Sequence, residues 1–216
     1  MNPPSAIRTL VLYADVWGTL SYFDDWKRAF ETSTEFSADT ANICPPGNTR
    51  DIAARIREYE LIVLLHSTHV NRQQYLRPLL PAFESRPGRL LAFVDNEVNL
   101  PGDYLSDKIA FLKAARADFV ATQLPLAAGE YLYADLSQTR VLAVPHALNP
   151  ERYRPVVPQA TRPVDIGVRS YEYFVLMGDI ERNQIIDYFA QTPFAPPLRL
   201  DINTAGTGRL PPDGWA

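Results

Sequence analysis

The sequence predicts an α/β protein built on a doubly wound, mainly parallel sheet. Five short runs of apolar, largely β-branched residues alternate along the chain with stretches of helical periodicity. Continuous apolar runs of this length are typical of strands that helices cover on both faces. Strands that alternate with helices form βαβ units with right-handed crossovers, and such units build one open sheet, here a Rossmann-like one.

The predicted strands are rich in Leu, Val, Ile and Phe. They comprise residues 9–13, 61–65, 90–94, 118–122 and 141–144. A further, weaker strand is expected within residues 35–43. Between the strands, helical periodicity covers residues 22–31, 49–59, 71–83, 106–115 and 126–136.

Three of these helices carry specific expectations. In the first helix, Trp26 lies on the apolar stripe that should face the core. Pro78 and Pro81 interrupt the third helix, because proline removes a backbone donor and clashes with the preceding turn. The last helix is apolar nearly all round, which predicts that it is buried, with Tyr131 and Tyr133 in the core.

Composition excludes several classes of protein. A chain of 216 residues, 46% of them hydrophobic, is long enough for one or two globular domains. The net charge of −4 and the lack of a Lys/Arg cluster argue against nucleic acid or anionic lipid as partners. A single cysteine, Cys44, excludes an internal disulfide, and with only three histidines it argues against structural zinc.

The sequence shows no signal peptide and no transmembrane segment. No apolar run follows a basic segment at the N-terminus, and the longest apolar stretch, residues 61–65, is far too short to span a bilayer. We therefore expect a cytoplasmic protein.

A proline-rich stretch divides the sequence into two parts. Residues 1–154 form the first predicted domain, residues 155–163 the linker, and residues 164–216 the start of a second α/β domain. That second part holds predicted strands at 164–168 and 198–202, a helix at 179–190, and Asp213 as the N-cap of another helix. Two strands and one complete helix cannot bury a core alone, so the sequence is expected to be a fragment. The alternative is that this part packs on the first domain.

The common catalytic motifs of doubly wound folds are missing. The sequence has no Gly-x-Gly-x-x-Gly after a strand, no phosphate-binding loop ending in Gly-Lys-Ser/Thr, no Gly-x-Ser-x-Gly and no His-Glu-x-x-His. What remains is a ligand site at the carboxyl ends of the strands, where such sheets bind their ligands. The polar loops expected at that edge are residues 15–19, 66–69, 95–99, 123–125 and 145–152.

One segment resembles a known family. Val144-Pro-His-Ala-Leu-Asn-Pro-Glu-Arg-Tyr-Arg-Pro155 resembles the segment that closes the N-terminal domain of GT-B-fold glycosyltransferases. Residues 162–169 and 178–183 resemble the start of the second domain in bacterial glycosyltransferases of the family 1 or spore-maturation-protein-like group. Residues 93–101 and 121–125 fit the same group, so the resemblance covers most of the chain from about Arg8 onward.

The resemblance implies a glycosyltransferase of hexosyltransferase type. Such an enzyme transfers a sugar from a nucleotide-sugar donor to a glycan or small-molecule acceptor, without a metal or another cofactor. The N-terminal domain holds the acceptor and the C-terminal domain holds most of the donor, so most of the donor site lies outside this sequence. The expected location is cytoplasmic, in peripheral proximity to a membrane.

Glycosyl transfer needs an acceptor, a group that takes its proton, and donors for the departing diphosphate. The candidates for proton transfer are Asp95, Glu97 and His66. The alternatives are helix capping or turn formation for the two acids, and a hydrogen bond to a neighbouring loop carbonyl for His66. The remaining candidates hold substrate. They are His69, Asn96, His146 and Asn149 for the substrate, Gly18 for a close approach of the backbone to a donor phosphate or sugar, and Arg169 for the donor phosphate.

Two other functions remain open at this point. One is a non-catalytic module in which two α/β lobes bind a small ligand or a protein. The other is a different two-domain enzyme of the same architecture, such as a sugar-nucleotide epimerase.

Overall fold

A computed structural model describes residues 6–15, 22–44, 48–69, 73–94, 97, 104–146, 157–170 and 180–204. The chain divides into two compact units, Met1–Leu148 and Asn149–Ala216. The domain boundary predicted after residue 154 falls within residues 147–156, which lie outside the described part. Among the described residues, no helix is long and apolar enough to cross a membrane.

The first unit is built on a six-stranded, all-parallel sheet with the strand order β2-β1-β3-β4-β5-β6. Its strands are β1 (Ile7–Tyr13), β2 (Phe36–Asn42), β3 (Leu61–Leu64), β4 (Arg89–Phe93), β5 (Phe119–Thr122) and β6 (Arg140–Ala143). The predicted α/β fold class is confirmed. The weak strand expected within residues 35–43 is β2, which lies at one edge of the sheet.

The strand order reverses between β1 and β3. From β1 the chain moves outward to β2 and then returns to the other side of β1, where β3 pairs in parallel with Val11 opposite Val63. All later strands are added on that side. In open parallel sheets, ligands bind beyond the carboxyl ends of the strands at such a reversal.

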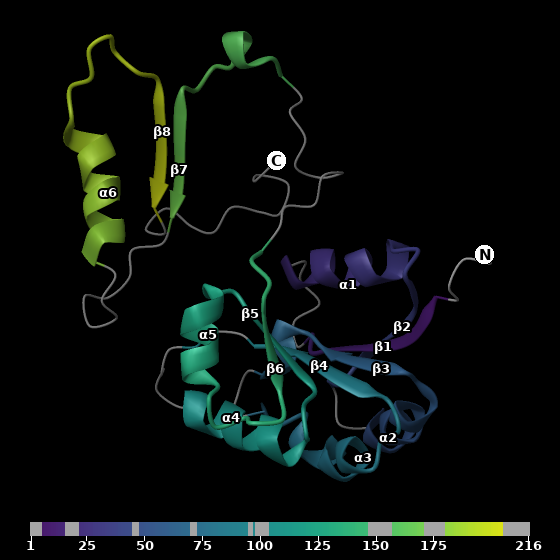
Figure 1. The fold of residues 1–216 in the computed structure, drawn as a ribbon. Helices are drawn as coiled ribbons and strands as arrows, with labels where there is room; N and C mark the ends of the chain where they lie inside the picture. The colour runs from purple at the N-terminus through teal and green to yellow at the C-terminus, as the bar shows by residue number, and fades with distance from the viewer. Residues whose placement is uncertain are drawn as a thin grey trace, which may run out of the picture. The chain divides into compact units, whose positions relative to one another are not determined.

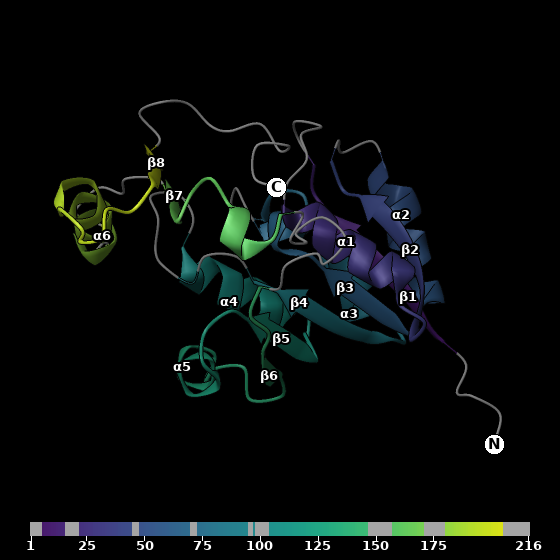
Figure 2. The same ribbon diagram turned by 90° about the horizontal axis from the view of Figure 1, so that it is seen from above.

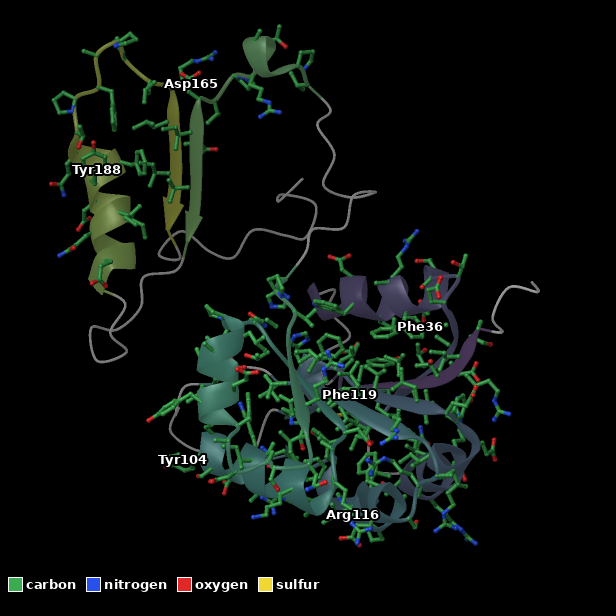
Figure 3. All side chains as sticks on the ribbon, in the orientation of Figure 1. Phe36, Tyr104, Arg116, Phe119, Asp165 and Tyr188 are labelled. Carbon is green, nitrogen blue, oxygen red and sulfur yellow. The ribbon has the colours of Figure 1, made fainter. Side chains whose placement is uncertain are left out.

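Successive strand residues point to opposite sides of the sheet, so apolar side chains lie on both of its faces. Helices cover both faces. Figures 1 and 2 show α1 (Tyr22–Thr32) on one face, and α2 (Thr49–Arg55), α3 (Leu80–Glu84) and α4 (Leu105–Ala114) on the other. Figure 3 shows side chains filling the space on both sides. The apolar core under α1 contains Val11, Phe30, Val63, Leu65, Phe93 and Ala121. The core on the opposite face is larger and includes Leu10, Leu12, Ile62, Leu64, Leu90, Phe111 and Val120.

Prolines shorten the helix predicted at residues 71–83. Its described part is a 3-10 turn, η5 (Arg77–Leu79), followed by the five-residue α3. Pro78 and Pro81 each lie in the first turn of one of these elements, where proline needs no hydrogen-bond partner. The helix predicted at 49–59 is an α-helix only as far as Arg55, and it continues as a 3-10 turn, η2 (Ile56–Glu58).

The prediction of a wholly buried helix at residues 126–136 was wrong. The helix α5 (Leu126–Leu132) is shorter, and Tyr131 is 82% exposed. Tyr133, just past its end, is only 2% exposed and belongs to the core. The helix lies over β5 and β6 at the edge of the sheet, so only one side of it is covered.

The second unit contains two parallel strands and a helix. These are β7 (Ile166–Ser170), β8 (Leu200–Thr204) and α6 (Ile180–Gln191). The strands begin two residues later than predicted. At their start, Arg199 donates to both carboxylate oxygens of Asp165, at 3.1 and 2.7 Å. On α6, Ile186 is buried, whereas the neighbouring Ile185 and Tyr188 are exposed.

Candidate active site at the carboxyl edge of the sheet

Hydrogen bonds join the carboxyl ends of β1, β2 and β3. The Ala14 N–H donates to Ser67 Oγ at 3.0 Å, directly across the point where the strand order reverses. The Asp15 N–H donates to Asn42 Oδ1 at 3.1 Å, and Asn42 Nδ2 donates back to the Asp15 carbonyl at 3.2 Å. The ends of these three strands therefore form one connected edge, as the ligand-binding rule for such sheets requires.

Four rings from four separate segments meet at this edge. Trp26 comes from α1, His66 follows β3, Phe93 ends β4 and His146 follows β6. The Trp26 ring centroid lies 4.8 Å from that of Phe93 and 5.6 Å from that of His66. The two histidine rings are 5.1 Å apart. We call this group the aromatic–histidine cluster; it brings together His66 and His146, which the sequence placed in different loops.

A hydrogen bond fixes the protonation of His146. The Trp26 Nε1–H donates to His146 Nδ1 at 3.1 Å, so Nδ1 must carry a lone pair. Burial lowers the pKa of His146, which keeps the ring neutral near pH 7. The proton of the neutral ring is therefore on Nε2, and His146 presents that N–H as a donor.

His66 is packed inside the cluster. It is 1% exposed, and its ring lies 5.2 Å from that of Phe93. Burial and, to a lesser extent, His146 lower the pKa of His66 to about 3. A base with so low a pKa takes up protons poorly near pH 7. The buried His66 ring is therefore better suited to positioning its neighbours in the cluster than to proton transfer.

His69 lies deeper, on the opposite face of the sheet. It is fully buried, and its ring packs perpendicular to Phe111 of α4 at 6.3 Å. Burial, followed by the charge of Lys108 and then His66, lowers the pKa of His69 to about 3. Contact between His69 and a substrate therefore requires a ligand group that reaches into the interior.

Glu97 is held by two hydroxyl groups. Thr122 Oγ1 and the Tyr133 OH both donate to Glu97 Oε1, the latter at 3.3 Å. The Leu124 N–H donates to Thr122 Oγ1 at 3.1 Å and so orients that hydroxyl. Burial and Glu97 raise the pKa of Tyr133, which therefore remains a phenol donor. A half-buried carboxylate is thus fixed at the end of β5.

Sequence reasoning missed the two residues that hold Glu97. The sequence marks Thr122 only as the end of a predicted strand, and Tyr133 only as an expected core aromatic. A hydroxyl at the last position of β5, at the ligand edge, is the signal that marks Thr122. Tyr133 has no such signal, because it reaches Glu97 across 36 residues of sequence.

The other predicted site residues are not placed. Gly18, Asp95, Asn96 and Asn149 lie outside the described residues. Arg169 lies in β7 of the second unit, and its side chain is outside the described part as well. Within the described ranges, no group of three or more His, Cys, Asp and Glu side chains is arranged to hold a metal ion.

No protein-family model matches the sequence, and no curated protein matches it significantly.

Proposed function

We propose that the protein is a glycosyltransferase that moves a sugar from a nucleotide-sugar donor to an acceptor hydroxyl at the carboxyl edge of the six-stranded sheet. The observation that carries the proposal is Glu97, a carboxylate fixed at this edge by Thr122 and Tyr133. The fold and the resemblance of residues 144–155 to GT-B-fold enzymes support it further. A cytoplasmic location and a glycan or small-molecule acceptor are parts of the same proposal.

Glu97 is assigned the proton transfer. Both described hydrogen bonds reach Oε1, so Oε2 is the atom that we assign to the acceptor hydroxyl. As the acceptor oxygen bonds to the anomeric carbon, its proton passes to Glu97, and the bond from that carbon to the diphosphate breaks. The nucleoside diphosphate leaves with the electron pair of the broken bond. This assignment corresponds to an inverting enzyme; in a retaining enzyme Glu97 would bind the acceptor only.

The aromatic–histidine cluster is assigned to the acceptor. His146 Nε2–H can donate to an acceptor oxygen, because Trp26 holds the other ring nitrogen. Trp26 and Phe93 supply apolar ring surface beside it. The donor contact predicted for Arg169 belongs to the second unit and stays a prediction.

Incubation with a panel of nucleotide sugars and glycan acceptors tests the proposal. We expect release of the nucleoside diphosphate to rise when a suitable acceptor is added, and the glycosylated acceptor to appear by mass spectrometry. Binding of acceptors without turnover of any donor would contradict transfer.

Binding of acceptors without turnover would favour the other function considered, a non-catalytic binding module. The structure offers one observation in its favour: the pKa values of His66 and His69 are both lowered to about 3, so neither histidine is tuned for proton transfer near pH 7. The fixed Glu97 carboxylate is the reason to prefer the enzyme.

A further inference from the structure

On the side that faces β3, the hydrogen-bond ladder of β1 ends on a side chain instead of a carbonyl. The Leu65 N–H donates to the Leu12 carbonyl at 2.9 Å. In a regular parallel ladder, the Leu65 carbonyl would then accept from Ala14, two residues further along β1. Instead, that carbonyl accepts from the N–H and the hydroxyl of Thr68, at 2.9 and 2.8 Å, and the Ala14 N–H donates to Ser67 Oγ at 3.0 Å. The Ser67 hydroxyl therefore takes the place of a strand carbonyl.

The side of β1 that faces β2 shows the same replacement. The Ile43 N–H donates to the Tyr13 carbonyl at 2.8 Å, so a regular ladder would bring the Ile43 carbonyl to the Asp15 N–H. Asn42 Oδ1 accepts that N–H instead, at 3.1 Å, and Asn42 Nδ2 donates to the Asp15 carbonyl at 3.2 Å. The same Oδ1 accepts from the Cys44 N–H at 3.0 Å, in a turn that ends β2. A side-chain amide thus holds the end of β1 where the backbone ladder stops.

The end of β1 is therefore held by side chains on both sides, at the reversal of strand order where such sheets bind ligands. A side-chain oxygen keeps the N–H paired while the neighbouring backbone leaves the ladder. After β3, this backbone forms the 3-10 turn η3 (His66–His69), which begins with the His66 ring of the aromatic–histidine cluster. Ser67 is the next residue of the turn and is 6% exposed. Its hydrogen bond ties the turn that carries His66 to the end of β1.

We propose that Ser67 is a positioning residue of the substrate site, and that its bond to the end of β1 fixes the His66 ring in the cluster. That ring lies between 5.1 and 5.6 Å from those of Trp26, Phe93 and His146. A shift of the turn moves the ring and changes the surface that the cluster offers to a substrate. The effect on substrate binding rests on the proposed assignment of the cluster to the acceptor, whereas the placement of the ring does not.

Removal of the Ser67 hydroxyl tests the placement without any substrate. NMR spectra of the whole 216-residue chain report the Trp26 indole N–H and the ring protons of His66 and His146. We expect these signals to shift in Ser67→Ala, because ring currents depend on how the rings pack. Ser85→Ala is the matched control, since Ser85 Oγ also donates to a backbone carbonyl, at 2.9 Å, but lies at the end of α3. It should leave the ring signals as they are in the wild type.

Steady-state kinetics with the acceptor separate a positioning role from a purely structural one. We expect the KM for the acceptor to rise by about fivefold in Ser67→Ala, as for the loss of one oriented hydrogen bond, with little change in kcat. A serine that served stability alone would lower the melting temperature and leave this KM unchanged.

A second variant covers the case in which Ser67→Ala does not fold. Asn42→Ala releases the end of β1 from its other side, at a half-buried position. It should shift the same ring signals. Asn48→Ala is its control, because the Asn48 side chain makes no capping hydrogen bond to α2.

Two results would overturn the positioning role, whether or not the chain transfers sugar. The first is a set of unchanged ring signals in the folded variants of Ser67 and Asn42. The second is an equal shift of these signals in Ser85→Ala or Asn48→Ala. Shifted signals with an unchanged KM would overturn the role in the substrate site alone. A wild type without turnover of any donor would contradict the proposed transfer, and the ring signals would still decide the role of Ser67.

Discussion

At the scale of single residues, the hydrogen bond from Trp26 to His146 determines which ring nitrogen of His146 carries the proton. These residues lie 120 positions apart in the sequence, yet Nε1 and Nδ1 are 3.1 Å apart. The bond selects one tautomer of His146 and turns the ring into a donor. This fits the substrate-binding role that the sequence predicts for His146, and leaves proton transfer assigned, as a proposal, to Glu97.

Trp26→Phe removes the donor and keeps an aromatic ring. We expect the neutral His146 ring to populate both tautomers and the KM for the acceptor to rise several-fold, because one oriented hydrogen bond is lost. Ring nitrogen chemical shifts of His146 report the tautomer directly. Thr32→Ala, at the end of the same helix, is the control and should change neither quantity. An unchanged tautomer in Trp26→Phe would contradict the account.

His66 and His69 make stability depend on pH. Their folded pKa values are about 3, below the ordinary value of 6.5, so the unfolded chain binds more protons between these values. Their contribution to stability is fully present above pH 6.5 and is lost as the pH falls toward 3. Each histidine should lower the free energy of unfolding by at most about 1.4 kcal/mol per pH unit in this window.

Urea denaturation at pH 7 and pH 5 measures that loss. His69→Phe should lose less stability than the wild type over this interval, because one of the two buried histidines is absent. Equal losses in the two proteins would show that His69 does not titrate as described.

At the scale of secondary-structure elements, α5 is set against the strands that carry the site. Gly129 lies inside this helix and is buried. A Cβ added there would lie 2.7 Å from Thr122 Cγ2 and 3.0 Å from Val141 Cγ1. The glycine lets α5 approach β5 and β6 closely, and so brings Tyr133 within reach of Glu97.

Gly129→Ala should therefore destabilise the protein, although alanine favours a helix by about 1 kcal/mol over glycine. It should also lower activity, because the displaced Thr122 no longer fixes Glu97. Gly167→Ala in β7 is the matched control, since nothing lies within 4 Å of its added Cβ. Melting temperature and turnover measure both effects. A Gly129→Ala protein that is more stable than wild type and fully active would contradict this packing.

At the scale of the molecule, the sheet explains why distant residues meet. Parallel strands end at one edge, so His66 and His146, which follow different strands, come together with Trp26 of α1. The same logic made much of the fold predictable. Long apolar runs identified β1, β3, β4, β5 and β6, and the rule for parallel sheets selected the loop that carries His66 and His69.

Prediction failed where side-chain contacts decide the outcome. Tyr131 and Tyr133 have the same residue type and are two positions apart, but one is exposed and the other is buried against Glu97. Helical periodicity alone cannot separate them, because the difference depends on which side of α5 faces β5 and β6. The bond between Trp26 and His146 is equally invisible in the sequence.

Turnover by Glu97→Gln tests the central assignment most directly. The amide keeps the size of the carboxylate and the hydrogen bonds from Thr122 and Tyr133, but it cannot take a proton. The account predicts that kcat falls by about 10²–10⁴ while the KM for the acceptor changes little. Asp187→Asn, on α6 of the second unit, is the control and should retain full activity. A Glu97→Gln protein with unchanged kcat would contradict the account.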